Sequence, residues 1–192
     1  SGGKYLNNAD GAYKYSLGTN GLGACATQYS SEYMKVRSFK GNEVSEMNFK
    51  KGKPSGKFTV REMEKKDKKH GTIVKWKPDL EVFTDINIPL EYYLDVLKRQ
   101  AVVNDNVVFI LKDQKGSKFE TYEFCYQSGI KDYVTETVAD KGLSSVQFWQ
   151  TEKKGKDRED KPEYKVKINA ALSFSNQVQL KEYYHNSSWL EY

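Results

Sequence analysis

The sequence has little cysteine and no long apolar run. Its 192 residues hold two cysteines, Cys25 and Cys125, with no C-x-x-C spacing, so neither a zinc ribbon nor a disulfide framework is indicated. We expect both to be reduced, buried thiols. No apolar stretch approaches the roughly 20 residues that span a bilayer, and the opening Ser1-Gly2-Gly3-Lys4 is not a signal peptide. The expected compartment is the cytoplasm, with no membrane partner, and the polar opening without Met predicts an excised fragment.

A strong charge of one sign is also absent. The chain carries 31 Lys and Arg against 26 Asp and Glu, a formal net charge of +5, which tolerates nucleic acid nearby without indicating contact. Aromatic residues make up 14% of the chain, whereas disordered chains hold few because they bury too little surface to offset ordering entropy. The chain is therefore predicted to fold, and it can form one ordinary domain or parts of two.

Recognisable catalytic sets are missing. No Gly-Lys-Ser/Thr follows the closely spaced glycines, which excludes a Walker A loop, and no strand precedes them to make a dinucleotide fingerprint. His70 and His185 have no acidic partner at a recognisable spacing, and no metal-ligand cluster or paired-carboxylate motif is visible. Neither a hydrolytic triad nor a metal site is predicted.

One cluster can carry chemistry, the run Gly18-Thr19-Asn20-Gly21-Leu22-Gly23. Closely spaced glycines that open a helix let backbone N–H groups approach a phosphate without Cβ obstruction, and the helix N-terminus adds a favourable partial charge. Lys4 and Lys14 can add positive charge, and Tyr13 can stack on a base or hydrogen-bond to it. On spacing alone two interpretations stay open, a phosphate site or a mobile Gly-rich loop flanked by ordinary surface residues.

Strand patterns dominate the segment that follows. A helix is predicted from Ala24 to about Ser31. Alternation then predicts an antiparallel meander over residues 33–39, 44–49, 57–63 and 72–76, with Gly41-Asn42 as the first hairpin turn. The charged run Glu64–Lys69 between the last two strands is predicted to be a solvated hairpin tip, with a DNA contact as the minor alternative.

The clearest helix pattern covers residues 89–104. Its apolar residues fall on one face, and we expect this stripe to be core that covers the preceding sheet rather than a partner-binding surface. Later patterns predict a hairpin of residues 107–112 and 119–125, a domain boundary near Ser128 and a short helix over 129–134. They also predict strands 146–149 and 164–171 with an exposed charged loop at 152–161 between them, and a C-terminus without a finished element. The apolar stripe consists of Leu90, Tyr93, Leu94, Leu97 and Ala101.

Several motifs in a fixed order resemble the gyrase B, topoisomerase IV and topoisomerase II family of type IIA DNA topoisomerases. The resemblance covers essentially the whole chain, and the order of the motifs is more specific than any one of them. The motifs are Gly2-Gly3-Lys4-Tyr5, Tyr13-Lys14-Tyr15-Ser16, residues 18–24, His70-Gly71-Thr72, Trp76–Phe83, Leu97–Asn104 and Tyr126–Val134.

The resemblance implies an α+β fold in two parts. Residues 1–128 would be the C-terminal part of a GHKL (Bergerat) ATPase domain with a mainly antiparallel sheet, with residues 1–23 as its ATP lid. Residues 129–192 would begin a transducer domain that is similar to ribosomal protein S5 domain 2.

The resemblance also implies nucleotide contacts. Gly18, Thr19, Asn20, Gly21, Leu22 and Gly23 would wrap the triphosphate. Lys4 and Lys14 would belong to the lid, Tyr13 would contact the adenine or ribose side, and Thr72 would face the pocket floor. Asn20 stands where bacterial gyrases usually carry His and eukaryotic enzymes carry Asn.

The implied activity belongs to the parent protein, which would use ATP and Mg²⁺ to drive DNA strand passage. The family's general-base Glu, Mg²⁺-binding Asn and adenine-reading Asp-x-Gly have no counterpart in these residues. We therefore expect no catalytic residue here, no bound ATP or Mg²⁺ and no ATP turnover by this chain alone.

The resemblance implies DNA and a DNA-cleaving subunit or domain as partners. The parent would dimerise through a segment before the ATPase core, so the fragment is expected to be a monomer. The parent would act in the cytoplasm at the nucleoid if bacterial, and in the nucleus if eukaryotic. Two alternatives stay open, a GHKL ATPase of chaperone or mismatch-repair type and a basic nucleic-acid-binding module without nucleotide chemistry.

Overall fold

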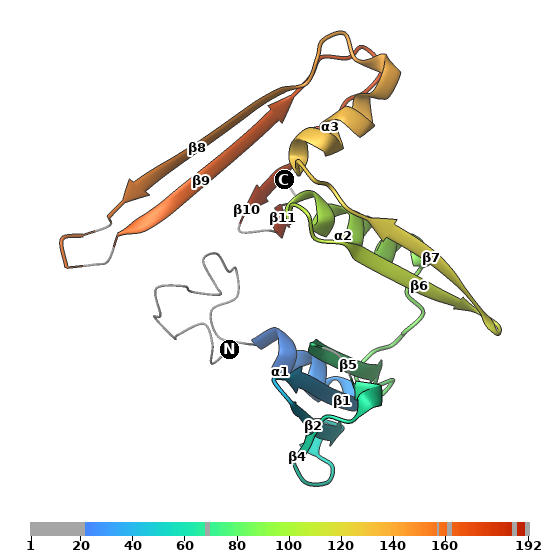
Figure 1. Ribbon diagram of the computed structural model, residues 1–192. Coiled ribbons are helices and arrows are strands. Elements are labelled where there is room, and N and C mark those ends of the chain that lie inside the picture. Colours follow the sequence, from blue (N-terminus) through green and yellow to red (C-terminus); the bar gives the residue numbers. More distant parts are fainter. Residues whose placement is uncertain (1–21, 68–69, 157, 161–162, 186–187, 191–192) are drawn as a thin grey trace. The chain divides into compact units, whose positions relative to one another are not determined.

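The computed structural model describes residues 22–67, 70–156, 158–160, 163–185 and 188–190. The described chain forms two compact units that divide between Ile88 and Pro89 (Figure 1). This division comes earlier in the chain than the predicted domain boundary near Ser128, which stays a prediction.

The first unit is an antiparallel sheet with one helix. Helix α1 (Leu22–Tyr29) leads into the strands, in agreement with the helix predicted after the glycines. The strand order is β3-β2-β1-β5, and β4 also pairs with β2. The alternating segments and the turn at Gly41-Asn42 are confirmed. The strands are β1 (Ser31–Lys40), β2 (Glu43–Lys50), β3 (Lys53–Pro54), β4 (Thr59–Glu62) and β5 (Gly71–Pro78).

The charged run after β4 is a crossover, and the predicted hairpin tip is wrong. β4 pairs with β2, whereas β5 pairs with β1, so the segment between them passes from one side of the β1–β2 pair to the other. The Met63 N–H donates to the Asn42 carbonyl in the β1–β2 turn at 2.8 Å. The 3₁₀ turn η2 (Lys65–Asp67) then buries Asp67. Alternation identifies strands but not their partners, which is why the sequence favoured a hairpin.

The second unit is built around helix α2 (Leu90–Val102), which packs on the hairpin of β6 (Phe109–Lys115) and β7 (Lys118–Phe124). Ala101, Val102 and Tyr126 form its buried core. The apolar stripe of α2 is core only in part: Ala101 is buried and Leu90, Leu94 and Leu97 are half-buried, whereas Tyr93 is 41% exposed. The strands that α2 packs against are β6 and β7 rather than the preceding ones.

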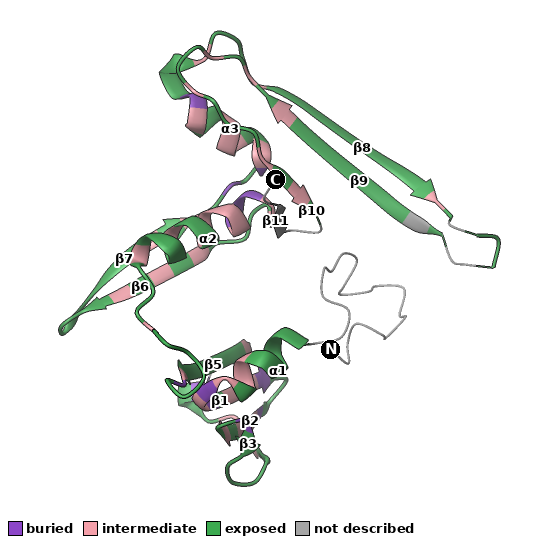
Figure 2. Cartoon of the chain, turned by 180° about the vertical axis from the view of Figure 1, so that it is seen from behind, coloured by how far each residue is buried: buried purple, intermediate pink, exposed green. Residues whose placement is uncertain are grey.

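A long two-stranded hairpin extends from the same unit and exposes most of its residues (Figure 2). Its first strand runs further than predicted into the charged segment, where Lys165 pairs with Glu152 at 2.9 Å. The C-terminal segment, predicted to hold no finished element, contains two short paired strands. The elements are α3 (Ile130–Val138), η3 (Ala139–Lys141), β8 (Gln147–Gly155), β9 (Tyr164–Leu172), β10 (Tyr183–His185) and β11 (Ser188–Leu190).

Both cysteines are free thiols, but the prediction that they are buried is wrong, because Cys25 and Cys125 are exposed. Cys25 lies on α1, a helix that buries none of its residues. Cys125 follows the last residue of β7.

Candidate functional site

The helix that carries the end of the glycine run is fixed to the sheet at its C-terminal end. The Gln28 side-chain amide donates to the Gly52 carbonyl at 2.8 Å. Gly52 is buried, and a Cβ built at this position would overlap the Tyr29 ring. Ser31, fully buried at the start of β1, donates its hydroxyl to the Thr27 carbonyl. These contacts attach the C-terminal end of α1 to the start of β1 and to the turn between β2 and β3.

The N-terminal end of α1, in contrast, is open. Leu22 is 69% exposed, and no atom of the described chain lies within 4 Å of a Cβ built at Gly23. The first turn of a helix has N–H groups without intrahelical acceptors, so this end can donate to a phosphate that approaches Gly23. Leu22 and Gly23 begin α1 at this exposed end, and their contact with phosphate stays a prediction. The other predicted lid contacts, Lys4, Tyr13, Lys14, Gly18, Thr19, Asn20 and Gly21, lie outside the described residues.

Thr72, the remaining predicted contact, lies on β5 opposite Ser38 of β1. Its side chain is exposed, and β5 ends the strand order at one edge of the sheet. No hydrogen bond among the described residues joins Thr72 to Leu22 or Gly23, so a role at the pocket floor stays a prediction.

The described residues include backbone donors for phosphate but no cluster of metal ligands. The open end of α1 offers N–H donors to phosphate, whereas no group of three His, Cys, Asp or Glu side chains in the described part of the chain can hold a metal ion. His70 and His185 are both exposed.

No helix of the described chain is long and apolar enough to cross a membrane.

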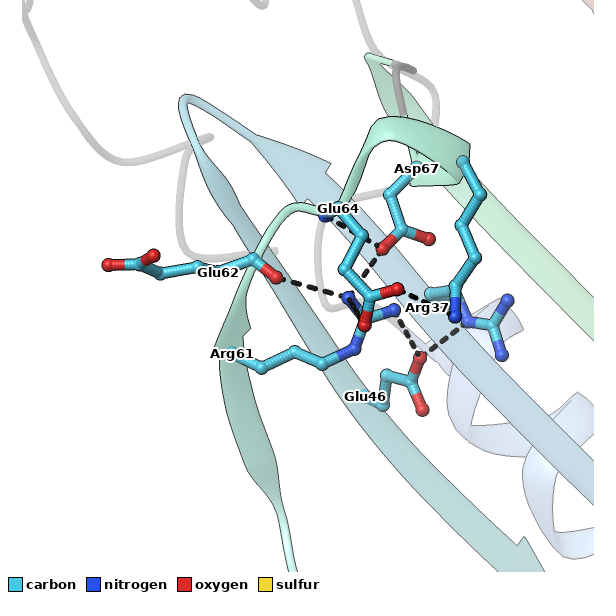
Figure 3. Close-up of polar contacts among 7 residues, drawn as sticks. Arg37, Glu46, Arg61, Glu62, Glu64 and Asp67 are labelled. Atoms are coloured by element: carbon cyan, nitrogen blue, oxygen red, sulfur yellow. Dashed lines mark hydrogen bonds and ion pairs between the residues drawn. The ribbon is translucent and has the colours of Figure 1, made fainter.

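A charged network at the β4 end of the sheet was not predicted from the sequence (Figure 3). Arg61 lies at its centre and pairs with Asp67, whose side chain is only 7% exposed. Asp67 also accepts the Glu64 N–H at 3.2 Å. The Arg61 guanidinium, helped by the Glu64 N–H, lowers the pKa of Asp67 to about 2 although burial opposes this. Arg61 further approaches Glu46, which pairs with Arg37 at 2.6 Å.

This network predicts a pH-dependent stability of the first unit. The folded-state pKa of Asp67 lies below the unfolded value of roughly 3.9, so its contribution is present above pH 4 and is lost as the pH falls toward 2. Asp67→Asn is expected to lower the urea midpoint at pH 7, and the gap to wild type should narrow between pH 5 and pH 2.5. Urea titrations at several pH values measure this gap. Glu64→Gln, a change at an exposed carboxylate of the same crossover, should shift the urea midpoint less. A difference in midpoint between Asp67→Asn and wild type that stays the same at every pH would contradict the role of the Asp67 carboxylate.

A second network joins α2, α3 and the loop after β7. The Tyr126 hydroxyl donates to Glu136 at 2.6 Å, and Lys98 donates to the same carboxylate at 2.7 Å. Burial raises the pKa of Tyr126, and it raises that of Tyr133 to about 12. Burial would also raise the pKa of Glu136, but the hydrogen bonds from Lys98 and Tyr126 lower it below its ordinary value. These tyrosines are packing groups that stay protonated.

The second unit also has a hollow of about 950 Å³, lined by α3, β9 and the segment before β10. Of the predicted nucleotide contacts, the three that the structure describes, Leu22, Gly23 and Thr72, do not line it. Leu22, Gly23 and Thr72 all belong to the first unit.

Comparison with known proteins decides the family. The chain is 30% identical over 185 residues to the B subunit of DNA topoisomerase 4 from Enterococcus faecalis, a match that covers 95% of this chain and 26% of that protein. The chain belongs to the gyrase B and topoisomerase IV B family. It is also 29% identical over 143 residues to the B subunit of DNA gyrase from Synechocystis, covering 73% of this chain and 13% of that protein. The chain thus spans about a quarter or less of these two relatives.

The fold agrees with the gyrase B family. The 43K ATPase domain of Thermus thermophilus gyrase B, solved with an aminocoumarin, matches with a TM-score of 0.58 and 19% identity over 73% of this chain and 37% of that chain. At this identity the likeness is one of fold, and it confirms the predicted α+β class with antiparallel sheets. No family model matches the chain.

Proposed function

We propose that this chain is part of the ATP-binding subunit of a type IIA DNA topoisomerase, which couples ATP binding and hydrolysis to DNA strand passage. The observation that carries the proposal is the similarity to the B subunit of a topoisomerase 4 along 185 residues. A chaperone or mismatch-repair ATPase is disfavoured, because the relatives are gyrase and topoisomerase IV subunits.

The proposal assigns residues 1–128 to a partial ATPase domain and residues 129–192 to the start of a transducer domain. Within the first part, Gly18 to Gly23 would wrap the triphosphate, with Lys4, Tyr13 and Lys14 in the lid and Thr72 at the pocket floor. The open N-terminal end of α1 supports this assignment, since its N–H groups have no intrahelical acceptors.

The parent protein would bind ATP with Mg²⁺. When bound, ATP would supply the free energy for strand passage, and the lid residues of this chain would bind and orient its phosphates. The Mg²⁺ ligands would come from residues other than those described here, which hold no cluster of three ligating side chains. The parent would act in the cytoplasm as a dimer on DNA, together with a DNA-cleaving subunit or domain, whereas this chain alone would be a monomer without ATP turnover.

The lid assignment makes a direct prediction for the full-length protein. Gly21→Val places a branched side chain where the backbone is proposed to approach the phosphates, so ATPase kcat/KM is expected to fall by about 100-fold, the order found when one hydrogen-bond donor to transition-state charge is lost. Steady-state ATP hydrolysis with DNA present measures it.

Gly116→Ala serves as the control, because no described atom lies within 4 Å of a Cβ there. It should leave ATPase activity near the wild-type value. Normal ATP hydrolysis by the Gly21→Val protein would contradict the assignment of the lid to the nucleotide site. ATP turnover by the isolated 192-residue chain in the presence of Mg²⁺ would contradict the proposed inactivity of this chain.

A further inference from the structure

One face of the first sheet collects lysines that no packing requirement explains. In the β1 ladder Tyr33 lies between Lys50 of β2 and Lys77 of β5. Two residues further, on the same face, Lys35 lies opposite Lys75. Residues opposite each other in neighbouring strands share a face about 4.8 Å apart, and alternate residues repeat about 6.7 Å along the strand. The four lysines, which we call the lysine face, are all exposed.

The charges on this face are only partly balanced. Lys77 pairs with Glu32 at 2.5 Å, and the Lys35 ammonium lies 5.9 Å from the centre of the Tyr33 ring. Within the described part of the chain, Lys50 and Lys75 have no carboxylate partner. Further along the face, Glu46 is already paired with Arg37 at 2.6 Å. The lysine face therefore keeps a net positive charge.

This arrangement costs stability, because like charges directly opposite each other in a sheet repel. Lys35 and Lys75 are such a pair. The excess of positive charge is concentrated in this part of the chain. Residues 22–88 hold 14 Lys and Arg against nine Asp and Glu, a net charge of +5 that equals the net charge of the whole chain. A sequence that breaks a local rule without a packing gain marks a functional surface.

We propose that the lysine face binds the phosphate backbone of duplex DNA. Exposed lysines act as point charges for phosphates, and duplex DNA presents phosphates at high density along its axis. The face offers one aromatic ring, that of Tyr33, and not the series of rings on which the bases of a single strand stack. The contact is thus with backbone and carries no sequence information. The choice of DNA as the polyanion rests on the proposed function.

The test uses the 192-residue chain and a fluorescent 24-base-pair duplex of arbitrary sequence, with anisotropy measured between 25 and 150 mM KCl. The double variant Lys35→Gln/Lys75→Gln is expected to bind on the order of tenfold more weakly at the lowest salt. Its slope of log K against log salt should be smaller in magnitude by about 2, because each phosphate contact contributes roughly 0.9.

The matched control is Lys112→Gln/Lys118→Gln, which removes two exposed charges from the β6–β7 hairpin of the other unit. It should bind within twofold of wild type. Thermal unfolding gives a second readout, because removing a repelling pair should leave the melting temperature of Lys35→Gln/Lys75→Gln equal to or above that of wild type. If the two lysines served only the fold, their replacement would instead lower the melting temperature.

Equal DNA affinity of the lysine-face variant and the control would overturn the proposal, as would preferential binding of an acidic peptide over the duplex. These outcomes are separable from the proposed function. Weakened binding by the lysine-face variant together with a full-length protein that passes no strands would uphold the surface and reject the topoisomerase assignment. Strand passage by the full-length protein together with unchanged DNA binding by the lysine-face variant would uphold the topoisomerase assignment and reject the surface.

Discussion

Gly129→Ala is expected to destabilise the second unit by about 2 to 3 kcal/mol, through backbone strain and crowding. Gly129 precedes α3 with φ of 54° and ψ of −127°, a conformation that L-residues avoid. A Cβ at this position would overlap the Asp105 carboxylate and lie 3.2 Å from the Val102 carbonyl oxygen. The carboxylate can rotate away, but the carbonyl belongs to the end of α2 and cannot. Urea unfolding followed by far-UV circular dichroism measures the loss.

Gly116→Ala measures the cost of a positive φ without steric crowding of the new Cβ. Gly116 also has a positive φ, of 62°, but no described atom lies within 4 Å of a Cβ built there. Its replacement should cost only about 1 kcal/mol, the ordinary penalty for a left-handed L-residue. Equal losses at the two positions would mean that the α2–α3 junction is not as tightly packed as the structure has it.

The second large effect is expected at the first sheet, where Met34→Asp should cost about 4 kcal/mol or more. Met34 is 7% exposed and lies between Phe49 and Trp76, so a carboxylate there would be buried between two apolar cross-strand partners. A loss of this size is comparable with the whole stability of a small unit. Hydrogen exchange followed by mass spectrometry should show β1, β2 and β5 unprotected.

The same experiment tests whether the two units are independent. In Met34→Asp the amides of α2 and α3 should keep their protection, because these helices belong to the second unit. Val60→Asp, on a strand residue that is 51% exposed, should leave both units protected. Loss of protection in both units of Met34→Asp would mean that they unfold as one.

Local patterns predicted most elements of the fold. The alternation of β1 and β2, the Gly41-Asn42 turn and the 3.6-residue period of α2 are set by neighbouring residues, and the structure confirms all three. The partner of β4 depends on residues far apart in sequence, so the charged run Glu64–Lys69 was predicted to be a hairpin tip rather than part of a crossover.

The candidate site was only partly predictable for a different reason. A glycine run that precedes a helix is visible in sequence, and Leu22 and Gly23 are found at the open end of α1. The Arg61–Asp67 pair was missed because its two residues lie in a charged stretch where every neighbour is also a candidate partner. The lysine face was missed because Lys35 and Lys75 become neighbours only through the pairing of β1 with β5.

The assignment of this chain to an ATP-operated topoisomerase is tested most directly by strand passage. The full-length protein is combined with its DNA-cleaving partner, and the change of plasmid linking number is measured with and without ATP. We predict linking-number changes in steps of two that require ATP and are lost with Gly21→Val. Changes in steps of one, or changes that proceed equally without ATP, would contradict the assignment.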